Sequence, residues 1–339
     1  MDIAFGLVSI GWEASLFLEE SEIHLTDKIN SVTNHKVPIV SYSESNINDS
    51  LKNENIDLIL IEDNMKMMRW ALKAISNKIN KAVYVQYLYG VNTNREEKRK
   101  SSMALLVGSN IPWKLMTSQY KSLLSKFDYV IPNSQTCGYI LRLFYDVSPS
   151  RTVYPPVGTD MRPLLDTLDP NTKKEGVLVF AGNIKNDSFS RDVVAEILNL
   201  AKTIQEPINL FISNPDTKAF FKNKGIKTYS SLSVYDLTQL YFRSKVTYVP
   251  TNYELFGHVG AESLLCGTPV ILDAYHPFLE SFPMETFAVK ISNPLDTISD
   301  TFLKLVNENV DINTAKNSIL KRYSTVESAR AFLDAVRLR

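Results

Sequence analysis

Short apolar runs alternate with amphipathic helical patterns along almost the whole chain. In the first half, these runs predict four strands, at residues 3–10, 57–62, 82–89 and 129–134. In the second half they predict six more, at residues 176–182, 208–213, 226–231, 246–251, 268–274 and 287–292. Alternation of buried strands with helices is typical of parallel-sheet units. The pattern therefore predicts an α/β protein with two doubly wound sheets.

Helical periodicity is clearest in two places. One helix is predicted over residues 234–245, where apolar positions recur at i, i+3, i+6 and i+7, namely Val234, Leu237, Leu240 and Tyr241. From residue 313 onwards the chain is again helical, with one apolar face formed by Ala329, Phe332, Leu333 and Val336. Residues 161–176 mix proline, aspartate, asparagine and charge without a period, which indicates a linker between the two sheets.

Composition narrows the class of protein. A chain of 339 residues suits two domains, because domains usually hold about 100 to 200 residues. Lysine plus arginine equals aspartate plus glutamate, 37 against 37, so there is no global basic field to hold nucleic acid or an anionic membrane. Cys137 and Cys266 lie far apart without a Cys-x-x-Cys spacing. This argues against a disulfide framework or a zinc site and favours a reducing, cytoplasmic location.

The chain start is predicted as a strand and its loop. It carries Asp2 instead of a basic segment, and Gly11, Trp12 and Glu13 interrupt its apolar run well short of a spanning length, so it does not read as a secretion signal. Residues 94–100, NREEKRK, form a dense run of charge that fits either a solvated helix start or a mobile loop near a ligand-binding cleft.

The stretch NYELFGHVGAESLLCGTPVI, residues 252–271, places two glutamates around a glycine turn. It follows a predicted buried strand and opens a predicted helix, whose first N–H groups favour an anion such as phosphate. Gly257 and Gly260 would let a ligand approach the backbone closely. Glu254 and Glu262 could face the same pocket, where carboxylates accept hydrogen bonds from paired sugar hydroxyls. Alternatively, Glu262 only offsets the helix dipole, which is worth about 0.3 to 1 kcal/mol.

This stretch resembles the Glu-x7-Glu signature of GT-B glycosyltransferases of the family 4 type. The matching positions are Glu254, Phe256, Gly257, Glu262, Cys266, Gly267, Thr268, Pro269, Val270 and Ile271. The resemblance extends upstream through residues 229–257, and it includes residues 127–141 and 151–160 at the end of the first half.

The resemblance implies a GT-B fold, with two doubly wound Rossmann-like domains facing each other across a cleft. Residues 1–165 would form the acceptor-side domain and 166–312 the domain that binds the nucleotide sugar, while helices in 313–339 would cross back to the first domain. Glu262 would bind the ribose hydroxyls. Glu254 and the backbone of Phe256, Gly257, His258 and Val259 would hold the donor sugar.

The resemblance also implies how the diphosphate is held. No metal and no cofactor are implied beyond the donor substrate, a UDP- or GDP-sugar, because helix dipoles and basic side chains neutralise the diphosphate. Gly182 and Asn183 match the family's glycine turn, but Ser188 stands where a lysine is usual, and the nearest cations are Lys185 and Arg191. Gly11 belongs to a loop that resembles the glycine loop of the first domain.

The usual histidine of the first domain is replaced by the region of Gln86 and Tyr87. The candidate catalytic residues are therefore Glu254, Lys185 and Arg191.

Two functions follow from these residues. The first is a retaining, metal-independent glycosyltransferase acting on a glycan, lipid-linked or protein acceptor, with no nucleic-acid partner and with peripheral membrane contact left open. The second is a degenerate GT-B protein that binds a nucleotide sugar without efficient turnover, and Ser188 and Gln86 motivate it. An epimerase of the same architecture lacks support, because the chain has no Asp-Ser-Gly-Gly-like turn with adjacent glutamates.

Overall fold

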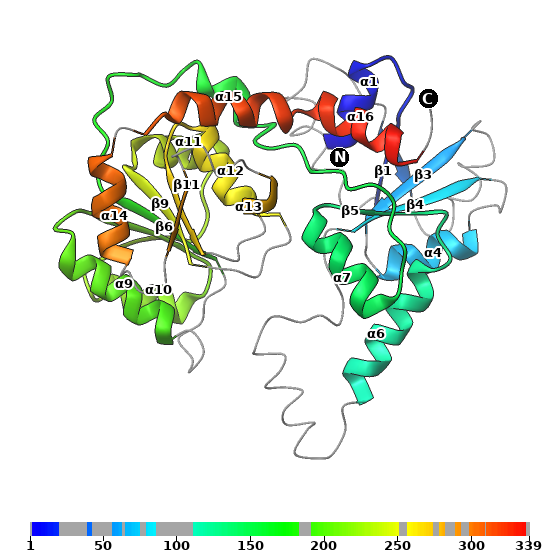
Figure 1. Cartoon of the computed structure of the whole chain (residues 1–339), viewed down its shortest axis with the longest axis horizontal. Coiled ribbons are helices and arrows are strands. Elements are labelled where there is room, and N and C mark those ends of the chain that lie inside the picture. Colours follow the sequence, from blue (N-terminus) through cyan, green and yellow to red (C-terminus); the bar gives the residue numbers. More distant parts are fainter. Residues whose placement is uncertain are drawn as a thin grey trace. The chain divides into compact units, whose positions relative to one another are not determined.

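The protein consists of two compact α/β units (Figure 1). The computed structural model describes residues 2–19, 39–42, 56–62, 65–74, 79–85, 111–182, 191–250, 256–273, 278–281, 289–292, 298–308 and 310–336. One unit comprises Met1–Pro156 with Tyr323–Arg339, and the other comprises Val157–Arg322. All the described strand pairs are parallel, so the predicted α/β class is confirmed.

The first unit contains two described parallel sheets. One has the order β3 (Leu58–Glu62), β4 (Asn80–Val85), β5 (Tyr129–Pro132), and the other pairs β1 (Leu16–Glu19) with β2 (Ile39–Tyr42). The described helices are α1 (Asp2–Ser9), α4 (Met65–Ala74), α6 (Ile111–Leu124), α7 (Gln135–Tyr145) and α16 (Thr325–Ala335). Strands β3, β4 and β5 were predicted from the sequence, whereas β1 and β2 were not.

The strand predicted over residues 3–10 is wrong, because this segment forms helix α1. Ile3 and Leu7 are one helical turn apart and pack into a core shared with β4, β5 and α16. Figure 1 shows α1 lying beside α16, and the two helices contact each other. A short apolar run does not by itself distinguish a strand from a helix. The contact with α16, from the other end of the sequence, favours the helix here.

Gly6 is where α1 and α16 approach most closely. A Cβ at this position would overlap the carbonyl oxygen of Thr325 and lie 2.7 Å from the Cβ of Ala329. We therefore expect Gly6→Ala to destabilise the protein by about 1 to 3 kcal/mol, the usual cost of overpacking. Thermal or denaturant unfolding of the variant measures this change.

Gly138→Ala in α7 is the matched control. Its new Cβ would meet only Pro132 and Pro149, at 3.5 Å or more. Alanine should be neutral there, or stabilising by up to about 1 kcal/mol through its helix propensity. Equal loss of stability in both variants would contradict a specific contact at Gly6.

The second unit is built on one parallel sheet of six described strands, in the order β11-β10-β9-β6-β7-β8. In chain order these are β6 (Val177–Gly182), β7 (Ile208–Ile212), β8 (Lys227–Tyr229), β9 (Val246–Val249), β10 (Val270–Asp273) and β11 (Val289–Ser292). All six were predicted from the apolar runs. The order doubles back from the edge strand β8 to the central strand β9, as in a doubly wound sheet.

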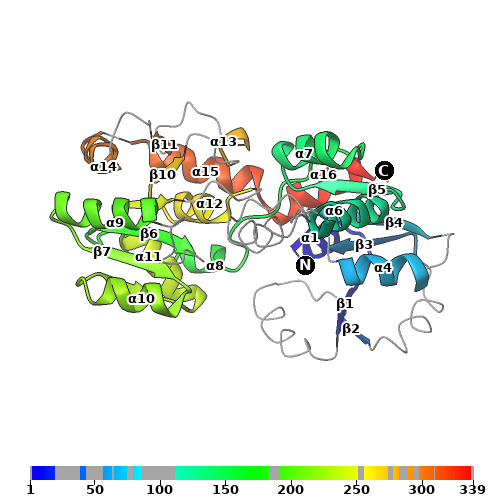
Figure 2. The ribbon, with the colours of Figure 1, turned by 90° about the horizontal axis from the view of Figure 1, so that it is seen from below.

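Helices surround this sheet and close its core. They are α8 (Arg162–Leu165), α9 (Arg191–Thr203), α10 (Pro215–Lys222), α11 (Val234–Arg243), α12 (His258–Leu265), α13 (Phe278–Ser281), α14 (Ile298–Asn307) and α15 (Ile312–Arg322). α14 packs on α9, and α15 packs on α12 (Figure 2). The predicted linker, 161–176, includes α8 and the approach to β6. The predicted helix over 234–245 is confirmed as α11.

Candidate functional site

The candidate site begins where β9 leads into α12. All four residues of β9 are buried, and the strand lies between β6 and β10 in the middle of the sheet. Phe256 is buried, and Gly257 caps α12 in the left-handed conformation, with φ of 97°. Only glycine adopts this conformation without strain. The turn thus presents the first N–H groups of α12, which lack acceptors inside the helix, at the carboxyl edge of the sheet, where doubly wound proteins bind ligands.

Packing holds the rest of α12 in place. The residues turned to the interior include Val259, Ala261, Leu264 and Leu265. Gly260 was expected to admit a ligand. In the structure a Cβ on Gly260 would lie 3.3 Å from the ring of Phe278, so its small size serves the contact with α13.

The end of α12 explains the Cys-Gly-Thr part of the signature. Gly267 has φ of 77°, its N–H donates to the Leu264 carbonyl, and the Thr268 N–H donates to the Ser263 carbonyl. This is a Schellman motif, which ends a helix. Burial, followed by the negative charge of Glu262, raises the pKa of the Cys266 thiol to about 12. These positions therefore shape the helix and place no reactive thiol in it.

Glu262 lies in the second turn of α12 and is half-buried. Its Oε2 accepts a hydrogen bond of 3.2 Å from the hydroxyl of Tyr241 on α11. The Tyr241 side chain is fully buried. The Glu262 carboxylate is thus held by a side chain of the neighbouring helix α11. A glutamate that only offset the dipole of α12 would need no such partner.

Aromatic rings surround the start of α12. The ring of Phe256 lies edge-on to His258, with centroids 5.1 Å apart, and to Phe278, with centroids 6.1 Å apart. Desolvation lowers the pKa of His258 below its ordinary value of 6.5, although part of the residue is exposed. This desolvation disfavours the charged imidazolium. The positive potential at this turn comes from the backbone N–H groups of α12.

The structure describes only part of the predicted diphosphate region. Gly182 ends β6, which neighbours β9 in the sheet, so this strand end and the α12 turn lie at the same edge. Arg191 begins α9, and its side chain lies outside the described part. Other predicted positions also lie outside the described residues, namely Gln86, Tyr87, residues 94–100, Asn183, Lys185, Ser188 and Glu254. Gly11 lies in the first unit, in the left-handed conformation with φ of 91°.

Three features of this region were not predicted from the sequence. Tyr241 was identified only as an apolar helical position, and nothing local indicates the partner of its hydroxyl. Lys174, in the predicted linker, donates 2.7 Å hydrogen bonds to the Gly267 carbonyl and to Oγ1 of Thr268. Burial lowers the pKa of Lys174 to about 8. Phe180 and Phe211, on the adjacent strands β6 and β7, stack with centroids 4.5 Å apart.

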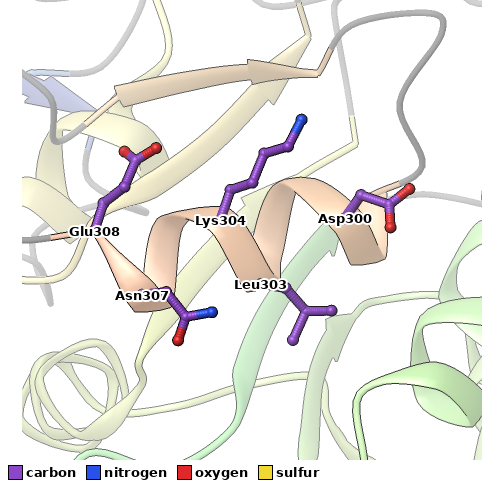
Figure 3. A pocket seen from close by; sticks show the side chains of 5 residues that line it. All are labelled: Asp300, Leu303, Lys304, Asn307 and Glu308. Carbon is purple, nitrogen blue, oxygen red and sulfur yellow. The ribbon is translucent and has the colours of Figure 1, made fainter.

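Two hollows of the second unit lie away from this turn. One is a shallow depression along α14 (Figure 3), lined by Asp300, Leu303, Lys304, Asn307 and Glu308. The other, of about 620 Å³, runs beside α11 and is lined by Thr172, Lys173, Glu175, Pro207, Asn209, Lys227, Tyr229, Leu232, Asp236, Gln239, Leu240, Arg243 and Ser244. Neither includes a residue predicted for the donor.

The described residues form neither a cluster of metal ligands nor a membrane-spanning helix. In that part of the chain, no three histidine, cysteine, aspartate or glutamate residues group as metal ligands. Within the same residues, no helix has the length and apolar character needed to cross a bilayer.

Comparison with solved structures defines the class of fold. The matches cover both units and include glycosyltransferases of the GT-B class, so the chain has the GT-B fold. No family model matches the chain, and no curated protein matches it. The predicted fold class is thus confirmed, whereas membership of family 4 stays a prediction.

Three solved structures illustrate the range of similar proteins. Sucrose-phosphate synthase from Thermosynechococcus elongatus is 16% identical, with a TM-score of 0.66 and coverage of 99% of this chain and 91% of that chain. Anabaena HepE, in complex with UDP and glucose, is 13% identical, with a TM-score of 0.64 and coverage of 99% and 94%. A Listeria monocytogenes protein described as a UDP-N-acetylglucosamine 2-epimerase is 12% identical, with a TM-score of 0.56 and coverage of 99% and 91%. Because one fold hosts several reactions, the reaction must be argued from the site.

Proposed function

We propose that the protein is a retaining, metal-independent glycosyltransferase of the family 4 type. It moves a sugar from a nucleotide donor, a UDP- or GDP-sugar, to a glycan, lipid-linked or protein acceptor in the cytoplasm. The observation that carries this proposal is the turn at Gly257, where the first backbone N–H groups of α12 lack acceptors within the helix and the half-buried Glu262 follows about one turn later. An anion-binding helix start next to a hydroxyl-binding carboxylate suits a nucleoside diphosphate.

Each residue of the proposed site has its own role in the transfer. Glu262 binds the ribose, Glu254 binds the donor sugar, and the α12 start receives the diphosphate together with Lys185 and Arg191. The bond from the anomeric carbon to the phosphate oxygen breaks, a bond to the acceptor hydroxyl oxygen forms, and the departing diphosphate takes the acceptor's proton. Groups aimed at the developing phosphate charge contribute most to the rate.

A screen of melting temperature against UDP-, GDP-, ADP- and TDP-sugars tests donor binding, because a ligand stabilises the folded state by RT ln(1 + [L]/Kd). We expect the donors that carry one of these bases to raise the melting temperature of the protein. Product analysis with such a donor should then show transfer of its sugar. Stabilisation of the unmodified protein by a donor without turnover, together with turnover by the Ser188→Lys variant, would favour the second function, a degenerate GT-B protein that binds a nucleotide sugar without efficient turnover. Conversion of the donor to an epimer would contradict glycosyl transfer.

Peripheral membrane contact is part of the proposal, and α7 supports it. The inward face of α7 buries Cys137, Leu141 and Tyr145, yet the outward side chains of Tyr139, Leu143 and Phe144 are also apolar and are 59%, 78% and 63% exposed. Residues 118–151, which include α7, carry four lysine or arginine residues and two aspartates. Two of these cations are paired, Lys121 with Asp146 and Arg151 with Asp334, so it is the exposed apolar and aromatic side chains of α7 that suit a bilayer surface.

We expect the double change Leu143→Glu and Phe144→Glu to weaken binding to phosphatidylglycerol vesicles by about 10-fold or more, since each buried apolar side chain contributes about 1.5 to 3 kcal/mol. Co-sedimentation with vesicles measures the effect. Leu303→Glu on α14, at a position 45% exposed, is the control. Absence of vesicle binding by the unmodified protein, or equal loss in the control, would contradict a membrane role for α7.

A further inference from the structure

We propose that Tyr241 is a positioning residue, whose hydroxyl orients the Glu262 carboxylate for the ribose of the donor. This inference rests on the proposed function and extends it to a side chain that does not itself touch the donor. The contact joins two helices, α11 and α12, that are separated by strand β9 in the sequence.

The geometry of the pair is the first support. Tyr241 is fully buried, and its hydroxyl donates to Oε2 of Glu262 over 3.2 Å. A buried hydroxyl needs an acceptor, because leaving it unpaired is costly. A glutamate side chain has several rotamers, and a hydrogen bond to its carboxylate favours those that keep the bond. The hydrogen bond therefore favours one carboxylate orientation before any ligand arrives.

The second support is that the Tyr241 backbone is tied to the end of α12. Oγ1 of Thr268 donates to the Tyr241 carbonyl over 2.7 Å. The same Oγ1 accepts from Lys174, which also donates to the Gly267 carbonyl. The hydroxyl of Tyr241 thus contacts α12, and its main chain contacts the residue that follows the end of α12.

A second buried pair anchors α12 from the side of the sheet. Oγ of Ser263, the residue after Glu262, lies 2.7 Å from Oγ1 of Thr247 on β9, and it donates to the Thr268 carbonyl over 3.0 Å. These hydroxyls are fully buried. Satisfied buried networks restrict the conformation of the groups they join. These contacts consequently fix the position of Tyr241 relative to α12, so the hydrogen bond from Tyr241 orients the Glu262 carboxylate.

The test compares ribose recognition, which a purely structural role would not change. Titration calorimetry measures the affinity of the unmodified protein for UDP and for 2′-deoxy-UDP, and likewise for GDP and 2′-deoxy-GDP. We expect the ribose form to bind more tightly. Tyr241→Phe should shrink the ratio of the two affinities by about 2- to 12-fold, the scale of one hydrogen bond.

Tyr248→Phe is the matched control. Tyr248 is also buried, and its hydroxyl donates over 2.7 Å to Oε2 of Glu196, which lies on α9 and not on α12. This variant should lower stability to a similar degree and leave the affinity ratio unchanged. In a Glu262→Ala background, Tyr241→Phe should change the ratio no further, because coupled residues are not additive.

The outcomes separate this inference from the proposed function. If the unmodified protein binds the ribose form more tightly than the 2′-deoxy form, and Tyr241→Phe keeps the same affinity ratio, the positioning role is overturned and the proposed function stands. Equal shrinkage of the ratio in Tyr248→Phe would also overturn it. Failure of the unmodified protein to bind either diphosphate would overturn both.

Discussion

Replacing Glu254 with glutamine is expected to lower kcat by about 100-fold or more, the scale of removing one preorganised electrostatic contact. Glu254 precedes Gly257 by three residues and Glu262 by eight. In the proposed function Glu254 contacts the donor sugar and Glu262 the ribose, because two carboxylates at this spacing do not share one pair of hydroxyls. A carboxylate there favours the positive anomeric centre, an interaction concentrated in the transition state. Steady-state kinetics with the donor found in the melting screen measure the change.

The affinity for the nucleoside diphosphate should change little in Glu254→Gln, because the proposal places the diphosphate at the α12 start. Replacing Lys185 or Arg191 with alanine should also slow turnover, since the departing diphosphate needs a cation. An unchanged kcat in Glu254→Gln, with the donor saturating, would remove Glu254 from the chemistry.

Replacing Glu262 with alanine is expected to weaken binding of the nucleoside diphosphate by about 1.5 to 3 kcal/mol, the range for hydrogen bonds to charged groups. The variant removes the proposed acceptor for the ribose hydroxyls, and it also removes the hydrogen bond that the Glu262 carboxylate accepts from the Tyr241 hydroxyl. Calorimetry with UDP and GDP measures the loss.

Glu196→Ala is the control for this prediction. Glu196 also accepts a hydrogen bond from a buried tyrosine hydroxyl, that of Tyr248, but it lies on α9. Its removal should leave nucleotide affinity unchanged. The ribose assignment of Glu262 would not survive equal affinities for the diphosphate in Glu262→Ala and in the unmodified protein.

Much of the second unit could be predicted from the sequence, because its strands are continuous apolar runs bounded by turn residues. The run at 246–251 became β9, and Gly267 ended α12 as the Cys-Gly-Thr-Pro pattern suggests. Such signals are local, since burial of a parallel strand and the left-handed glycine both follow from a few adjacent residues.

The first unit was less predictable. The segment 3–10 is apolar enough for a buried strand, and its helical form depends on α16, more than 300 residues away in the sequence. Strands β1 and β2 pair with each other, but the sequence of neither segment predicts this pairing. The position of Gly260 likewise suggested a close approach of a ligand to the backbone. In the structure, the space that a Cβ on Gly260 would need lies against the ring of Phe278.

The sequence by itself determined the α/β class, the strand-turn-helix at Gly257 and the presence of two carboxylates around it. Only the tertiary structure decided that Tyr241 contacts Glu262, that Lys174 and Thr268 tie α11 to the end of α12, and that α1 packs on α16. The physical reason is the range of the interactions. Periodicity and turn chemistry act between neighbouring residues, whereas the partner of a buried hydroxyl is set by how distant segments meet when the core forms.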